Sequence, residues 1–326
     1  MNNLKEASVY KLNSTGGCIM NSRRKFLRDL VGVSAGVGLS ALPYDLLAKQ
    51  DLESLTILHT NDIHCHIDPF PEGNSTYQGR GGLARMAGMI NRIKEKNDNV
   101  LLLDAGDMFQ GTPYFNYYKG ELILKVMSEM GYDASTIGNH EFDNGLAGIE
   151  NSIDFANFPF VCSNYDFSNT RLFNIFPEFT IFRKNGIKVG VYGLGIELEG
   201  LVSERNYQET IYRDPVKIAL EKEVFLKHEK ACDVVICLSH LGLEYAETKV
   251  SDKLLAAETH HTDLIIGGHT HTFLDVPLEL RNANGNRIIV NQAGWGGMVL
   301  GRIDFIFDRN KNTKEAILTQ NSLTDL

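Results

Sequence analysis

Short apolar runs alternate with longer amphipathic stretches from Leu55 onward. The short runs are typical of buried strands, and the longer stretches repeat their apolar residues at helical spacing. The expected strands are residues 55–58, 100–103, 134–137, 160–162, 189–192, 234–238 and 264–266. The expected helices are residues 82–96, 114–130, 145–156 and 215–230. Strands that alternate with helices predict an α/β fold.

Two dipeptides predict tight turns between strands. Asn185-Gly186 separates two apolar runs, and a two-residue hairpin of this kind needs positive φ at both turn positions. Asn284-Gly285 predicts a second hairpin, and strand-like residues dominate from there to Ile306. Residues 51–326 contain no repeat, low-complexity tract or linker. We therefore expect them to form one catalytic domain.

The segment before this domain has the pattern of an export signal. Arg23 and Arg24 lie in a basic segment that precedes the uncharged residues 30–44, and together they predict a leader over residues 1–48 of the twin-arginine type. The apolar part is shorter than the roughly 20 residues that span a bilayer, so no stable membrane span is expected. The alternative, an amphipathic helix, is weakened by three glycines in the stretch. The expected location is periplasmic or extracellular.

Composition excludes some classes of function. Lys and Arg number 32 and Asp and Glu number 41, which gives a formal net charge of −9. Proteins that coat nucleic acid rely on an excess of basic residues, so no nucleic-acid polymer is expected as a partner. The five cysteines include no C-x-x-C pair, which argues against a disulfide scaffold or a cysteine zinc site.

Polar residues with metal-binding side chains follow five of the expected strands. The segments are HTNDIH, DAGD, GNHEFD, SHLG and GGHTH. Ligands of α/β sheets bind beyond the carboxyl ends of strands, so these segments predict one shared crevice. In an extended chain residues i and i+2 point to one face, which would bring Asp62 with His64, and His269 with His271, to one ion. Carboxylate, imidazole and amide ligands suit zinc, manganese or iron.

The ordered series NDIH, GD, GNHE, SH and GGHTH resembles the calcineurin-type binuclear metallophosphoesterases. GNHEFDNG, LSHLG and GGHTH resemble in particular the catalytic domain of bacterial 5′-nucleotidases, over residues 54–308. The resemblance implies a four-layer α-β-β-α sandwich with two central mixed β-sheets. It also implies two divalent metal ions, such as Zn or Mn, whose ligands would be Asp62, His64 and His271 for one, Asn139, His240 and His269 for the other, and Asp107 for both.

The resemblance implies a catalytic dyad of His140 and Asp143. The spacing agrees with it, because Asp143 lies one helical turn beyond His140 and could fix the tautomer of the imidazole. Two divalent ions, two carboxylates and a metal-bridging hydroxide leave a charge of about +1, which attracts a phosphate. The expected function is hydrolysis of a phosphate monoester, such as a nucleoside monophosphate, with His140 binding a phosphoryl oxygen or protonating the leaving group.

Two alternatives stay open. One is a phosphodiesterase or cyclic-nucleotide hydrolase on the same scaffold. The other is a metal-binding subunit that acts only with another chain, because two-domain 5′-nucleotidases carry a C-terminal substrate domain that we do not expect after Leu326. A separate substrate-domain polypeptide would then supply base recognition.

Several residues near the motifs have structural interpretations. We expect Cys65 to act as a small hydrophobe rather than as a thiol near the metal, and Glu141 to make a structural hydrogen bond. Trp295 is expected to pack over a glycine-rich turn, although contact with substrate is the alternative. Solvated or capped side chains are expected for His59, His66, His260 and His261.

Overall fold

The computed structural model describes residues 52–73, 76–247, 249–308, 313–319 and 322–323, all within the unit Asp45–Leu326. The expected leader, residues 1–48, lies outside the described residues. Within the described part of the chain, no helix has the length and apolar character needed to cross a membrane.

The first sheet is built around three parallel strands that begin the domain. β1 (Leu52–Thr60) pairs in parallel with β2 (Val100–Asp104), which pairs in parallel with β3 (Ala134–Ser135). On its other side β1 pairs with the antiparallel β12 (Val299–Asp308), so the end of the described chain returns beside its start. β13 (Thr313–Leu318) and β14 (Ser322–Leu323) both add to β12 in antiparallel orientation.

The second sheet has the order β10-β11-β9-β8-β6-β5. Its four central strands are parallel and its two edge strands are antiparallel. The strands are β5 (Phe179–Lys184), β6 (Ile187–Leu194), β8 (Val234–Ser239), β9 (Leu264–Gly267), β10 (Leu278–Arg281) and β11 (Arg287–Asn291). Both expected hairpins are confirmed, because Asn185 (φ 49°) and Gly186 (φ 79°) join β5 to β6, and Gly285 (φ 73°) lies between β10 and β11.

The apolar faces of the two sheets pack against each other. Leu55 and Ile57 of β1 share one buried cluster with Val189 and Val191 of β6, while Leu58 points to the opposite face of its sheet. This period of two is the alternation of a pleated strand. Because both faces of each sheet are covered, the strands read as nearly continuous apolar runs in the sequence.

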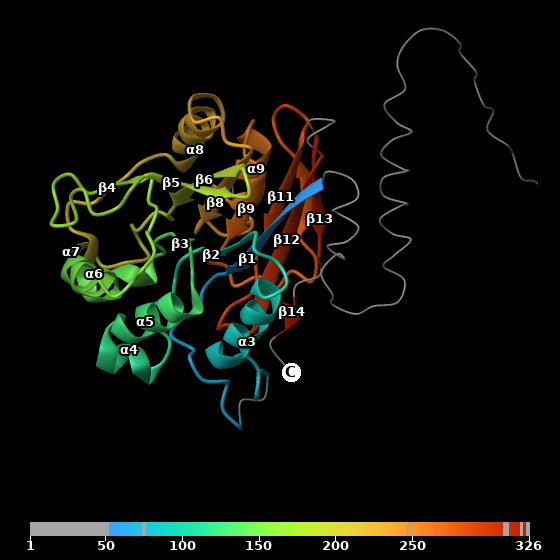
Figure 1. The fold of residues 1–326 in the computed structure, drawn as a ribbon. Coiled ribbons are helices and arrows are strands. Elements are labelled where there is room, and N and C mark those ends of the chain that lie inside the picture. The colour runs from blue at the N-terminus through green and yellow to red at the C-terminus, as the bar shows by residue number, and fades with distance from the viewer. Residues whose placement is uncertain (1–51, 74–75, 248, 309–312, 320–321, 324–326) are drawn as a thin grey trace, which may run out of the picture. The chain divides into compact units, whose positions relative to one another are not determined.

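Helices cover the outer face of each sheet (Figure 1). Leu83, Met86 and Ile90 of α3 (Leu83–Lys94) pack on the first sheet together with α5 (Glu121–Met130) and α6 (Gly145–Ile153). α8 (Pro215–Val224) and α9 (Asp252–Glu258) pack on the second sheet. Helix, sheet, sheet and helix form the four layers that the resemblance implied, so the fold class is confirmed.

Short elements complete the described chain. They are α4 (Pro113–Tyr118), η1 (His140–Asn144), β4 (Tyr165–Asp166), α7 (Glu204–Tyr207), β7 (Ile211–Tyr212) and the π-turn η2 (Phe225–Glu229). β4 and β7 pair with each other in a small antiparallel ribbon.

Two expected elements differ from the structure. The helix over 114–130 is broken into α4 and α5, because Lys119 (φ 57°) and Gly120 (φ 115°) adopt left-handed backbone. Residues 160–162 form no strand, only a bridge between Phe160 and Ser135. Their neighbours explain this: the N–H of Val161 donates to Ser135, whereas that of Cys162 donates to Pro177, so no continuous ladder forms.

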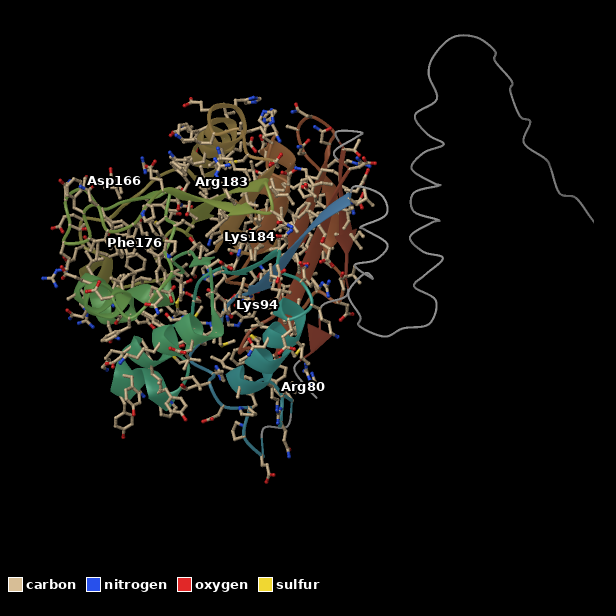
Figure 2. The ribbon with its side chains drawn as sticks, viewed as in Figure 1. Arg80, Lys94, Asp166, Phe176, Arg183 and Lys184 are labelled. Carbon is tan, nitrogen blue, oxygen red and sulfur yellow. The ribbon has the colours of Figure 1, made fainter. Side chains whose placement is uncertain are left out.

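An ion pair connects the edges of the two sheets. Lys184, labelled in Figure 2, is the last residue of β5. Its Nζ lies 3.8 Å from Oδ1 of Asp133, which immediately precedes β3. The other carboxylate oxygen of Asp133 accepts a hydrogen bond from the backbone N–H of Leu102 at 2.8 Å. Both contacts anchor the chain just before the segment that carries Asn139 and His140.

Candidate metal centre

Every candidate ligand lies directly after a strand of one of the two sheets. β1, β2 and β3 of the first sheet lead into the segments with Asp62 and His64, with Asp107, and with Asn139. β8 and β9 of the second sheet lead into those with His240, and with His269 and His271. The strand ends of both sheets therefore meet at one site, as expected for ligands of α/β sheets.

One group of three ligands consists of Asp62, His64 and His271, whose ligand atoms lie within 4.8 Å of one another. Oδ1 of Asp62 lies 3.3 Å from Nε2 of His271 and 3.8 Å from Nε2 of His64. The two imidazole nitrogens are 3.0 Å apart. Asp62 and His64 are buried, whereas 38% of the His271 side chain is exposed, so this group opens to solvent on the side of His271.

A second group consists of Asp107, His240 and His269. Nδ1 of His269 lies 2.8 Å from Oδ1 of Asn139, which places the amide beside this group. Nε2 of His240 lies 2.9 Å from Oδ2 of Asp107. All seven candidate ligands are thus brought together at the strand ends.

Asp107 lies between the two groups. Its Oδ2 is 2.9 Å from Nε2 of His240 in the second group and 4.0 Å from Nε2 of His64 in the first. Its Oδ1 accepts a hydrogen bond of 2.8 Å from the backbone N–H of His140. One carboxylate is therefore within reach of both positions where a cation would fit.

The backbone presents these ligands in a way that the sequence did not predict. The prediction of an extended backbone at these ligands is wrong, because Asp62 (φ 51°) and His64 (φ 50°) have a left-handed backbone conformation. His269 (φ 71°), His271 (φ 52°) and Asp107 (φ 56°) share this conformation. Non-glycine residues rarely adopt it, and such strain persists where the surrounding structure holds it, often at functional sites.

Gly138 lets two of the ligand segments approach closely. A Cβ atom built on Gly138 would lie 2.2 Å from Oδ1 of Asp107, closer than any real contact. Only glycine therefore allows Asn139 and His140 to reach the Asp107 carboxylate.

Glu141 holds the Asp107 segment to the His140 segment. Its buried carboxylate accepts backbone hydrogen bonds from Asp107 (3.0 Å), Met108 (2.9 Å), Phe109 (3.1 Å) and Gly138 (2.7 Å). Burial, together with the charge of Asp107, raises the pKa of Glu141 to about 7. The structural hydrogen bond expected for this residue is confirmed.

Two buried amide side chains form hydrogen bonds next to the ligands, and the sequence pattern predicted neither of them. Asn61 donates to Oδ2 of Asp62 at 2.6 Å and to the carbonyl of Gly294 at 2.6 Å. Gln292 donates to the carbonyl of Gly268 at 2.7 Å and accepts from the N–H of Thr272 at 2.9 Å, which brackets His269 and His271. Asn61 lies within the HTNDIH motif, whereas Gln292 lies in none of the motifs that predict the site.

The side-chain atoms that face the site are suited to bind cations. The Nδ1 atoms of His240 and His64 face the carbonyl oxygens of Ala105 (2.7 Å) and Phe109 (3.0 Å), which directs the lone pair of each Nε2 into the site. Nε2 of His240 is buried without a hydrogen-bond partner among the described residues, although it faces Asp107. Burial lowers the pKa of His240, but the Asp107 carboxylate outweighs it and raises the pKa to about 10, so the site stabilises positive charge.

His140 and Asp143 form a pair at the opening of the site. Nδ1 of His140 lies 2.9 Å from Oδ2 of Asp143, and about a third of each side chain is exposed. Burial lowers the pKa of His140, but the hydrogen bond to Asp143 and the charge of Asp107 outweigh it and raise the pKa to about 9. The ring is held by Nδ1, which leaves Nε2 for a ligand.

Three further residues have roles that the structure defines. Cys65 is buried, and burial raises the pKa of its thiol to about 12, so it behaves as the expected small hydrophobe. A solvated or capped side chain was expected for His59. The solvated alternative is wrong, because the residue is fully buried, and its Nε2 lies 2.8 Å from the side-chain nitrogen of Asn291. Trp295 was expected to pack over a glycine-rich turn, and its indole stacks on the ring of His271.

Most of the described fold has counterparts in known proteins. The calcineurin-like phosphoesterase family matches residues 55–273. The snake venom 5′-nucleotidase of Gloydius brevicauda is 33% identical over 279 residues, which cover 79% of this chain and 46% of that protein. The 5′-nucleotidase precursor from Thermus thermophilus has a TM-score of 0.72 and 31% identity, covering 82% of this chain and 54% of that chain.

A shorter solved chain matches over nearly its whole length. The calcineurin-like phosphoesterase YfkN from Bacillus subtilis has a TM-score of 0.67 and 27% identity, covering 83% of this chain and 90% of that chain. In contrast, the present chain spans about half the length of the first curated relatives that it matches. With the match over residues 55–273, this chain belongs to the calcineurin-like phosphoesterase family.

Proposed function

We propose that this chain is a metal-dependent phosphate monoester hydrolase of 5′-nucleotidase type. Asp62, His64 and His271 would hold one divalent cation, and Asn139, His240 and His269 the other, with Asp107 shared. The observation that carries the proposal is the position of Asp107, within 2.9 Å of His240 and 4.0 Å of His64, beside the His140 pair.

Two bound cations would lower the pKa of water and stabilise the charge that grows on the phosphoryl oxygens. The remaining contributions come from the chain. Asp143 keeps the proton of His140 on Nδ1 and stabilises a positive imidazolium. The Nε2 atom of His140 would then donate to a phosphoryl oxygen or protonate the leaving alkoxide, a contribution of about 10²- to 10⁴-fold in rate.

The substrate class follows from the relatives. The curated relatives include proteins named 5′-nucleotidase, so we propose nucleoside monophosphates as substrates of this chain. Recognition of the base by a separate polypeptide is a further part of the proposal. The matched region covers about half of those relatives. Export by the Arg23-Arg24 leader is proposed on the sequence pattern alone.

The test is turnover by the purified chain with added Mn²⁺ or Zn²⁺. AMP and an aryl phosphate are supplied as monoesters, and a cyclic nucleotide and an aryl diester are supplied in parallel. We expect faster hydrolysis of the monoesters. If the protein binds metal but hydrolyses none of these substrates, the proposal that it is a phosphate ester hydrolase is wrong. Faster hydrolysis of the diesters would favour a phosphodiesterase, the second candidate.

A further inference from the structure

Two histidines outside the candidate metal centre meet on the surface of the second helical layer. His228 lies in the π-turn η2 and is exposed, whereas His261 lies in the loop between α9 and β9 and is half-buried. Their Nε2 atoms are 3.2 Å apart, and the two rings are nearly perpendicular, at 89°. Neither residue belongs to either group of the candidate centre.

The helix that carries His228 is unusual at this point. α8 continues into η2 with π geometry, in which the N–H of Lys230 donates to the carbonyl of Phe225. π-helical segments are rare, and those that do occur are often found at functional sites. His228 lies within this π segment, and its ring meets that of His261.

Glu223 holds the loop that carries His261 through hydrogen bonds to its backbone. The buried carboxylate of Glu223 accepts backbone hydrogen bonds from His260 (2.7 Å), His261 (2.9 Å) and Thr262 (2.8 Å). Its negative charge lies behind the histidine pair and favours a positive charge in front of it. Burial lowers the pKa of His261, which keeps the imidazole in the neutral form that binds metals.

We propose that His228 and His261 form a second type of metal site, for a late divalent transition metal such as Zn²⁺, Ni²⁺ or Cu²⁺. Two imidazole nitrogens at about 2.0 to 2.1 Å from one tetrahedral ion are separated by about 3.3 Å, and the observed separation of 3.2 Å matches it. Imidazole is a preferred ligand of these ions, and water would complete the coordination. The bound ion would connect the end of α8 to the loop before β9.

His260 provides a matched control. It is adjacent to His261 in the sequence, but its Nδ1 lies 3.6 Å from Oε1 of Glu223, and its ring is 6.4 Å from that of His261. His260→Ala therefore removes a surface imidazole without removing a proposed ligand. The backbone N–H groups that Glu223 binds are unchanged in all three histidine variants.

The experiment compares wild type with His228→Ala, His261→Ala and His260→Ala. Each protein is first loaded with Mn²⁺, then dialysed to equilibrium against micromolar Ni²⁺, and the bound ions are counted. Wild type and His260→Ala should retain one more Ni²⁺ per chain than the other two variants, and Ni²⁺ should raise their Tm by more than it raises that of the other two. Hydrolysis should be the same in all four proteins.

Equal Ni²⁺ content in all four proteins would overturn the proposal and leave the pair as a simple hydrogen bond between imidazoles. Loss of the ion in only one of His228→Ala and His261→Ala would overturn it as well, because both ligands are required. This outcome does not depend on phosphatase activity, so the site stands or fails independently of the proposed hydrolase.

Discussion

The ring of His271 stacks on the indole of Trp295, with the ring planes 10° apart and the centroids separated by 5.4 Å. Among the candidate ligands, His64 and His240 are oriented through Nδ1 by backbone carbonyls, whereas His271 is the most exposed imidazole of its group. The indole therefore supplies a flat surface that restricts the rotation of this ring.

Trp295→Ala should weaken cation binding at the group of Asp62, His64 and His271. Loss of groups that orient a metal-binding histidine typically costs 10- to 100-fold in affinity, and we expect a loss in that range. Trp295→Phe keeps an aromatic face and should restore most of the affinity. Calorimetric titration with Mn²⁺ measures it, and an unchanged affinity in Trp295→Ala would show that the stacking is packing alone.

His140→Asn should reduce kcat by about 10²- to 10⁴-fold and leave the metal content intact. The reason is that His140 faces the opening and is paired to Asp143, but is not among the proposed ligands. Asp143→Asn should show a smaller loss. Metal analysis beside the kinetics separates the two roles: a parallel fall of rate and metal content would make His140 a ligand or a structural residue.

Glu141→Gln should destabilise the site although it preserves the side-chain volume. The new NH₂ group would face backbone N–H donors, and a lost or unsatisfied buried hydrogen bond costs about 1 to 3 kcal/mol. The midpoint of urea unfolding measures the change. Glu150→Gln is the control, because Glu150 makes an exposed ion pair with Arg171. Equal effects of the two variants would contradict the bracing role of Glu141.

His59 should contribute to loss of stability in acid. Burial lowers the pKa of His59 from 6.5 to about 3, so the folded protein keeps it neutral while the unfolded chain takes up a proton below about pH 6.5. Stability from this group is complete above that pH and falls as pH decreases, by on the order of 3 kcal/mol between pH 7 and pH 4. Urea unfolding with a chelator present, at both pH values, should show a smaller decrease in His59→Gln than in wild type. An identical decrease in stability in both proteins would show that a group other than His59 causes the loss of stability in acid.

The sequence predicted the parts of the fold that depend on local pattern. The apolar runs that became β1, β2, β6, β8 and β9, and the Asn185-Gly186 turn, follow from side-chain alternation and from residues that tolerate positive φ. Because polar motifs followed successive strands, their convergence was also predictable. The split at Lys119 and Gly120 was missed, although the glycine was a visible signal.

The supporting contacts of the site could not be predicted in the same way. Trp295 meets His271 because they follow β11 and β9, which pair in parallel in the second sheet. Asn61 meets Gly294 because β1 pairs with β12, the strand that comes after Gly294. Left-handed backbone at Asp62 and His64 is likewise imposed by tertiary hydrogen bonds, such as those of their N–H groups to Gly106 and Asp107. Such features depend on long-range geometry that no local pattern encodes.

A count of metal ions per chain decides whether two cations share Asp107. After loading with Mn²⁺ and removal of free metal, wild type should contain two ions per chain with magnetic coupling in the electron paramagnetic resonance spectrum, as for ions about 3.5 to 4 Å apart. Asp107→Ala should lose that coupling and at least one ion. A single uncoupled ion in active wild-type protein, or two coupled ions in Asp107→Ala, would show that Asp107 is not shared by two cations.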